Sequence, residues 1–281
     1  MRTILMLTVL AGLALAGPTG KTENADMSGL EAYLVSFPAS PTADPDPVQV
    51  YELTYSFHLR DVDGAPQTRT AVTGRYTRDT ENGRFRWNDV SIAGAGADGE
   101  LPEPTPLTIM EDFEYGLSAE IAEESLYERF PKSDLKDLIK TMVWDGMMIE
   151  LVDMSLNETD SLPLHEFSLV GSWEDVDVQM ADWGKLTMKD LRVKWSGVTV
   201  MHGEPCAVAF YMSFANPVDA DPARGRSCYW GQFWVSLVDR EIECLTLNED
   251  VVLEVAMLGD FKRILNFQRE VEFEKHPQAG R

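Results

Sequence analysis

The sequence predicts a mainly β protein of the α+β class. Its expected core is a large curved antiparallel sheet or half-barrel, with a short N-terminal helix and a helical insertion that covers one face. From residue 48 onward, apolar and polar residues largely alternate, which is typical of strands with one buried face. Turn signals separate closely spaced segments of this kind, which favours consecutive antiparallel strands. The exception lies at about 117–145, where the apolar spacing is helical.

The first sixteen residues have the three parts of a cleavable secretory signal. Arg2 provides a positive charge, an apolar run extends from Ile4 to Leu15, and Ala14-Leu15-Ala16 forms a small-residue cleavage site. The apolar run is shorter than the roughly 20 residues that span a bilayer, and no later segment is long and apolar enough. We therefore expect export to the periplasm or the cell exterior, with no transmembrane segment in the mature protein.

Residues 17–47 are expected to form a leader with one short helix and a linker. Residues 28–31 match a capping box, and the apolar residues that follow have helical spacing. Pro38 ends this helix, and a stretch rich in proline and aspartate continues to Pro47. The rest of the chain, 48–281, is expected to be a single β-rich domain.

Alternation defines the expected strands of this domain, and Asp63-Gly64 and Asn82-Gly83 mark turns between the first three. Residues 93–106, rich in glycine, proline and alanine, are expected to be a loop. Asp239-Arg240 and Gly259-Asp260 mark the turns of the last hairpins. The expected strands are Gln49–Leu59, Thr68–Arg78, Phe85–Ile92, Met147–Leu156, Leu186–Trp195, Cys206–Phe214, Cys228–Leu237, Glu241–Leu247, Val251–Met257 and Ile264–Phe273.

The insertion is expected to contain two helices, Ser118–Phe130 and Ser133–Trp144, separated by Pro131. The second carries an apolar stripe that includes Leu138 and Met142, so it is expected to pack on the sheet.

The formal net charge of −23 over 281 residues bounds the choice of partners. So acidic a surface repels phosphate backbones, and we expect no nucleic acid partner. Three cysteines, Cys206, Cys228 and Cys244, lie in expected strands. An oxidising compartment permits one disulfide and leaves one thiol over, and the sequence does not decide whether any pair forms.

No segment carries a recognisable catalytic, cofactor or metal motif, so no catalytic residue, cofactor or metal ligand is assigned. His202-Gly203-Glu204-Pro205-Cys206 partly matches the zinc motif of nucleobase deaminases. That chemistry needs a second thiolate three residues further on, where this chain has Ala209. A turn that leads into a strand is the better interpretation of this segment.

The aromatic and thioether residues suggest a ligand site. Trp230 and Trp234 lie on one face of a single expected strand, about 13 Å apart. In a groove they would stack on sugars or contact an acyl chain, whereas in the core they would only pack, which is commoner. Met142, Met147 and Met148 lie in the segment expected over the sheet, where flexible thioethers suit an apolar pocket or fill gaps.

Arginines gather on the second and third expected strands. Arg75, Arg78, Arg84 and Arg86 would form a basic hairpin that receives an anionic ligand or an acidic partner. Cross-strand pairing with nearby acidic residues is the commoner alternative.

The signal, followed by a helix, a strand meander, a helical insertion and a second β run, resembles the half-barrel carriers of the bacterial periplasm that hold lipoproteins or lipids. The segment Arg226–Leu237 is also similar to a signature of exported bacterial proteins. The resemblance implies a curved sheet with an apolar concavity, and it assigns no role to an individual residue.

Three functional hypotheses follow. The first is an exported, non-enzymatic binding protein with an apolar or amphipathic ligand between the sheet and the helical cover. The second is a glycan-acting hydrolase, which would need two carboxyl groups facing each other across a cleft. The third is an envelope assembly protein that presents its basic hairpin or a sheet edge to another protein.

Overall fold

The computed structural model describes most of the chain after residue 42. The described residues are 43–97, 99–116, 121, 123–131, 134–157, 169–173, 176–179, 185–189, 191–220, 223–256 and 262–276. The expected signal, the expected leader helix and most of the linker lie outside these residues, as does the expected turn at Gly259-Asp260.

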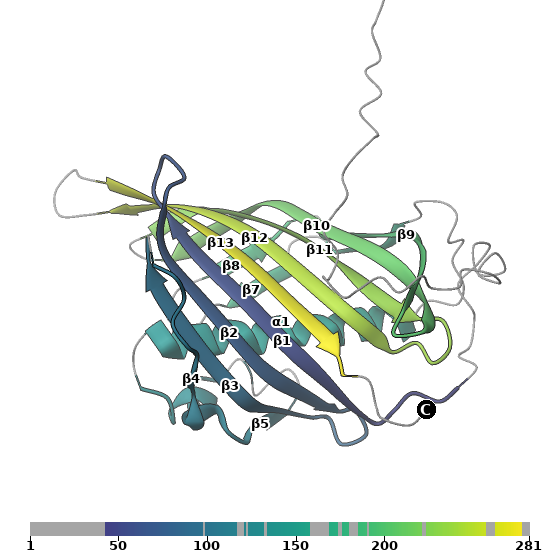
Figure 1. Ribbon diagram of the computed structural model, residues 1–281. Helices are drawn as coiled ribbons and strands as arrows, with labels where there is room; N and C mark the ends of the chain where they lie inside the picture. The colour runs from purple at the N-terminus through teal and green to yellow at the C-terminus, as the bar shows by residue number, and fades with distance from the viewer. Residues whose placement is uncertain are drawn as a thin grey trace, which may run out of the picture.

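The strands form one antiparallel sheet, as the alternation predicted. Figure 1 shows its long strands running diagonally across the molecule, with the helix behind them. The strands are β1 (Val48–Arg60), β2 (Pro66–Asp79), β3 (Arg84–Gly96), β4 (Thr105–Pro106), β5 (Phe113–Gly116), β6 (Leu169–Trp173), β7 (Val176–Gln179), β8 (Lys185–Met188), β9 (Leu191–Met201), β10 (Glu204–Ala220), β11 (Ala223–Ser236), β12 (Ile242–Ala256) and β13 (Lys262–Lys275).

The two β runs meet in the middle of the sheet. The strand order is β4-β3-β2-β1-β13-β12-β11-β10-β8-β7, with β9 paired to β10 and to β6, and β5 paired to β3. The first strand therefore pairs with the last along most of its length, with Tyr55 opposite Val271. This pairing places β1 beside β13, although more than 200 residues separate the paired positions in the sequence, such as Arg60 and Asn266.

Several strands are longer than expected. The two strands expected at Glu241–Leu247 and Val251–Met257 are replaced by one continuous strand, β12 (Ile242–Ala256), because Asn248 to Asp250 keep their pairing with β11 and β13; Met257 lies outside the described residues. The expected loop at 93–106 begins later, since β3 continues to Gly96, which pairs with Thr68. In both places, polar or small residues form regular strand pairs, although their residue types did not predict a strand there.

The helical insertion differs from the expectation. A single helix, α1 (Asp134–Asn157), runs through Met147–Leu156, so the strand predicted there is wrong. Its buried residues recur at helical spacing: Ile139, Met142, Val143, Ile149 and Val152. The apolar run after Gly146 is therefore the continuing face of a helix. Within 118–130, the described residues form only a short 3-10 turn, η4 (Glu124–Tyr127); another, η2, covers Thr108–Met110.

The core lies between α1 and the face of the sheet that it covers, which we call the inner face. Aromatic side chains of several strands, among them Tyr76, Trp87 and Phe273, meet here with their ring centroids 4.8 to 6.2 Å apart. Gly146 of α1 lets the helix approach, since a Cβ at that position would lie 3.1 Å from the Tyr76 ring. The opposite face of the sheet, which we call the outer face, carries mainly polar side chains.

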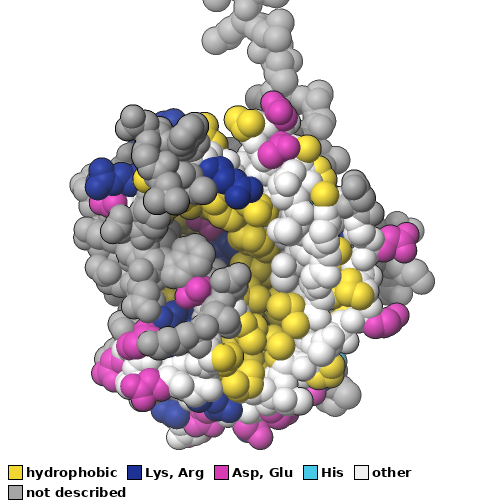
Figure 2. All heavy atoms as spheres, turned by 90° about the vertical axis from the view of Figure 1, so that its left-hand side faces the viewer, with side chains coloured by type: hydrophobic (Ala, Val, Ile, Leu, Met, Phe, Trp, Pro, Cys, Tyr) yellow, Lys and Arg dark blue, Asp and Glu magenta, His cyan; other side chains and the backbone are white. Residues whose placement is uncertain are grey.

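Seen from its left-hand side, the molecule has a band of hydrophobic side chains that reaches the surface (Figure 2).

None of the described helices is long and apolar enough to span a bilayer.

Candidate functional site

A groove of about 220 Å³ crosses the outer face of the sheet. Five adjacent strands, β10, β11, β12, β13 and β1, provide its lining, so it lies where the two β runs join. The lining residues are Thr54, Ser56, Phe210, Trp230, Gly231, Gln232, Trp234, Thr246, Asn248, Glu270, Val271 and Glu272.

Alternation along β11 directs both tryptophans to this face. Tyr229 and Phe233 point to the inner face and are 4% and 2% exposed. Trp230, Gln232 and Trp234 therefore point to the outer face, where all three line the groove. The expected grouping of the two tryptophans on one face agrees with this placement.

The strand register places aromatic and acidic residues on opposite sides of the groove. In one row across the strands, Trp230 lies opposite Asn248, and Asn248 lies opposite Glu270. In the next row, the sequence is Gln232, Thr246 and Glu272. Since neighbouring strands lie about 4.8 Å apart, the backbones of β11 and β13 are separated by roughly 10 Å. The floor between them consists of hydroxyl and amide side chains.

The two tryptophans have different surroundings. Trp234 is 8% exposed and packs with Cys206 and Cys244 in a small apolar cluster on the outer face. Trp230 also lines the groove, but it is only half-buried. Trp234 therefore anchors one wall of the groove, whereas the indole of Trp230 is accessible to a ligand.

The acidic side of the groove has no compensating cation among the described residues that line it. Burial raises the pKa of Glu272, and the neighbouring Glu274 adds to the rise. Glu270 and Glu272 are two positions apart on one strand, so both carboxylates point the same way. This arrangement differs from the opposed pair of a glycoside hydrolase, in which one carboxyl group lies on each side of the scissile bond.

A small space lies on the inner face between α1 and the first strands of the sheet. It measures about 10 Å³, which is room for about one water, and Met147 and Glu150 contribute to its lining. Met142 is 1% exposed, and Met147 and Met148 pack at the margin of the core. The sheet thus separates these methionines from the tryptophans, and the structure does not bring the two sets of predicted ligand-binding residues together.

The arginines of β2 and β3 pair with acidic residues. Arg75 contacts Asp89 at 3.0 Å, Arg84 contacts Glu114 at 2.9 Å, and Arg86 lies 4.0 Å from Asp112. These three guanidiniums are about half exposed. Cross-strand and neighbouring acids therefore neutralise much of the hairpin's positive charge.

Arg78 lies on the inner face and is 1% exposed. It binds the Glu150 carboxylate of α1 through two nitrogens and donates a 2.6 Å hydrogen bond to Gln49. It also contacts Asp153 at 3.1 Å. Arg78 thus attaches the helix to the sheet.

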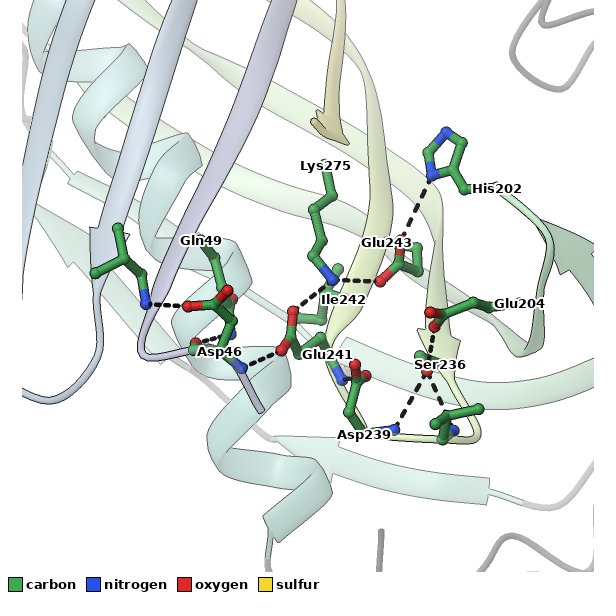
Figure 3. A network of polar contacts seen from close by, with 12 residues as sticks. Asp46, Gln49, His202, Glu204, Ser236, Asp239, Glu241, Ile242, Glu243 and Lys275 are labelled. Atoms are coloured by element: carbon green, nitrogen blue, oxygen red, sulfur yellow. Dashed lines mark hydrogen bonds and ion pairs between the residues drawn. The ribbon is translucent and has the colours of Figure 1, made fainter. Parts of the chain in front are cut away.

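A network of polar contacts lies at the end of the sheet where β11 turns into β12 (Figure 3). Lys275 binds Glu241 and Glu243, and His202 contacts Glu243 at 3.4 Å. Hydrogen bonds to Glu243 and Glu274 raise the pKa of His202 against the opposing effect of burial. These contacts connect the β9–β10 turn to the last two strands.

Three carboxylates of this region could together contact a metal ion. Oxygens of Glu204, Asp239 and Glu243 lie within 4.8 Å of one another. Ser236 and Lys275 already bind two of these side chains, at 3.1 Å to Glu204 and 2.6 Å to Glu243. These hydrogen bonds and ion pairs within the protein therefore explain much of why the three carboxylates lie close together.

All three cysteines are free thiols. Cys206 and Cys244 are buried on β10 and β12, on either side of β11, and Cys228 is half-buried. The disulfide that the sequence left open is not formed.

Comparisons with known proteins add little. Neither a protein-family model nor a curated protein matches the chain. Among solved structures, it is similar to lipovitellin, in a structure that describes lipid–protein interactions, with 11% sequence identity and a TM-score of 0.34. The match covers 84% of this chain and 26% of the lipovitellin chain. A likeness at this level assigns neither a family nor a function.

Sequence reasoning identified the tryptophan side of the groove and missed its acidic side. Glu270 and Glu272 alternate with apolar residues on the last strand, which marks them only as outward-facing. Their position opposite Trp230 and Gln232 depends on the exact register of the hairpins that join β11, β12 and β13, which local alternation does not fix.

Proposed function

We propose that this protein is an exported binding protein that holds a small amphipathic ligand in the groove on the outer face of its sheet. The observation that carries the proposal is the placement of Trp230 and Trp234 along one wall of a groove of about 220 Å³, opposite polar side chains. Concave sites with aromatic walls and a few polar groups are typical of small-ligand binding.

The location differs from the one that the sequence favoured. The space found between the sheet and α1 beside Met147 is about 10 Å³, so the groove of about 220 Å³ on the outer face is the better-supported site. The groove is smaller than the roughly 300–1,000 Å³ of sites that enclose drug-sized ligands. It suits a head group or a single ring, with any longer tail of the ligand extending over the surface.

Native mass spectrometry of the protein purified from its host tests the proposal. We expect a fraction with added mass, and we expect Trp230→Ala to lose this mass while its thermal unfolding midpoint changes little, because Trp230 is only half-buried. Val252→Ala, which removes a side chain 49% exposed on β12, is the matched control and should keep the mass. A protein with the mass of the polypeptide alone would contradict the proposal.

Export is tested separately. Cell fractionation of the full chain should yield a product that begins at Gly17, outside the cytoplasm. An uncleaved product in the cytoplasm would remove export from the proposal and leave the groove unaffected.

A further inference from the structure

We propose that the ligand of the groove carries an organic cation, an alkylammonium or quaternary ammonium group, held between Trp230 and the carboxylates of Glu270 and Glu272. This inference rests on the proposed function, because it names the ligand class of the same groove.

The charge of the groove is the first argument. Its described lining contains two carboxylates and no lysine, arginine or histidine. Of the basic residues nearby, Arg60 donates to Gln268 at 2.6 Å, and Arg269 pairs with Glu249 at 2.6 Å on the inner face. His58 contacts Ser56 at 2.9 Å, within range of the charge of Glu270, but does not line the groove. A cationic ligand would supply the positive charge that the lining of the groove lacks.

The aromatic wall is the second argument. The faces of indole and phenyl rings attract cations whose centres lie within about 6 Å of the ring centroid. Trp230 and Glu270 lie in one row across the strands with Asn248 between them, and the backbones of their two strands are roughly 10 Å apart. A cation held above Asn248 would therefore lie between the Trp230 indole and the Glu270 carboxylate, with Glu272 two residues further along the same strand.

The combination favours an organic cation over other charged ligands. A Ca²⁺ ion requires six to eight oxygen ligands, and an aromatic wall supplies none. An anion is repelled by Glu270 and Glu272, as well as by a net charge of −23. A group such as trimethylammonium carries positive charge on an apolar surface, so it can contact both the indole of Trp230 and the carboxylates on the other side of the groove.

A pair of probes of nearly equal shape separates charge from hydrophobic contact. Choline carries a quaternary nitrogen, and 3,3-dimethylbutan-1-ol carries a carbon at the same place. We expect choline to change the tryptophan fluorescence of the mature protein saturably, and to bind at least about fivefold more tightly than the neutral alcohol. Higher salt should weaken the binding of choline and leave that of the alcohol unchanged.

Charge variants test the acidic wall. Glu270→Gln and Glu272→Gln should each weaken choline binding severalfold and leave the alcohol unaffected. Glu81→Gln, which removes the same charge from the exposed turn between β2 and β3, is the control and should bind choline as the wild type does. Equal thermal unfolding midpoints will show that the variants are folded.

Two outcomes would overturn the inference. If the alcohol binds as tightly as choline and Trp230→Ala abolishes both, the groove is a ligand site without charge selection, and the proposed function stands alone. If neither probe binds the folded wild type at millimolar concentration, the cation inference fails. A neutral ligand found by native mass spectrometry would in that case still support the proposed function.

Discussion

Arg269 of β13 and Asp145 of α1 form an ion pair between the helix and the inner face of the sheet. The same guanidinium contacts Glu249 of β12 at 2.6 Å. Asp145 and Glu249 are 4% and 8% exposed, so one arginine neutralises two buried carboxylates and joins three elements.

Replacing this arginine should therefore destabilise the protein strongly. Arg269→Met keeps much of the side-chain volume but leaves two carboxylates buried without a counter-charge. We expect the free energy of unfolding in urea to fall by about 3–5 kcal/mol. Arg84→Met is the matched control, because Arg84 and Glu114 form a pair whose side chains are 41% and 45% exposed. A loss of about 1 kcal/mol or less is expected there. If Arg269→Met and Arg84→Met lower the free energy of unfolding equally, the buried ion pairs of Arg269 do not contribute more than an exposed pair.

Gly231 of β11 leaves the room that the hydroxyl of Tyr211 occupies when it donates a 2.6 Å hydrogen bond to the carbonyl of Thr246. A Cβ at residue 231 would lie 1.9 Å from that carbonyl oxygen and 2.6 Å from the hydroxyl. Gly231→Ala should lower the free energy of unfolding by roughly 3 kcal/mol, because backbone must move and a buried hydrogen bond is lost. Gly96→Ala is the control and should be nearly neutral, because a Cβ at residue 96 would have no other atom within 4 Å. If the two variants unfold at the same urea concentration, the close approach at Gly231 is not the cause of the loss.

His202 should make stability depend on pH. Its pKa is raised by hydrogen bonds to Glu243 and Glu274, so the folded state binds the proton more tightly than the unfolded state does. The resulting stabilisation is fully present below the unfolded pKa of about 6.5 and is lost as pH rises through the folded pKa. In urea titrations, His202→Asn should therefore differ from the wild type more at pH 6 than at pH 9. For His276→Asn, whose side chain is 60% exposed, we expect little difference at either pH. A His202→Asn effect independent of pH would refute the assignment.

Thiol reactivity should separate the three cysteines. Burial raises the pKa of Cys206 and of Cys244 well above that of a free thiol, so both should resist a thiol reagent in the folded protein. Only Cys228, which is half-buried, should react without denaturant, and all three should react in urea. Counting thiols with a chromogenic disulfide reagent checks this. A single reactive thiol in urea would instead reveal a disulfide.

Side-chain periodicity determined much of the architecture by itself. Alternation in β1 and β11 decided which residues face the core, since successive side chains of a strand point to opposite faces. It therefore put Trp230 and Trp234 on one face. The same reasoning failed at residues 147–156, where a nearly continuous apolar run fits a strand or a buried helix equally well.

The exact register and the long-range pairing of the strands belonged to the tertiary structure alone. The pairing of β1 with β13 closes a separation of roughly 200 residues, and no local pattern contains that information. The packed fold also set the register of the β11–β12 and β12–β13 hairpins, which puts Glu270 in the row of Trp230, and it placed α1 against Arg78 on the inner face. Periodicity depends on neighbours along the chain, whereas a binding groove depends on neighbours across the sheet, which only the packed fold brings together.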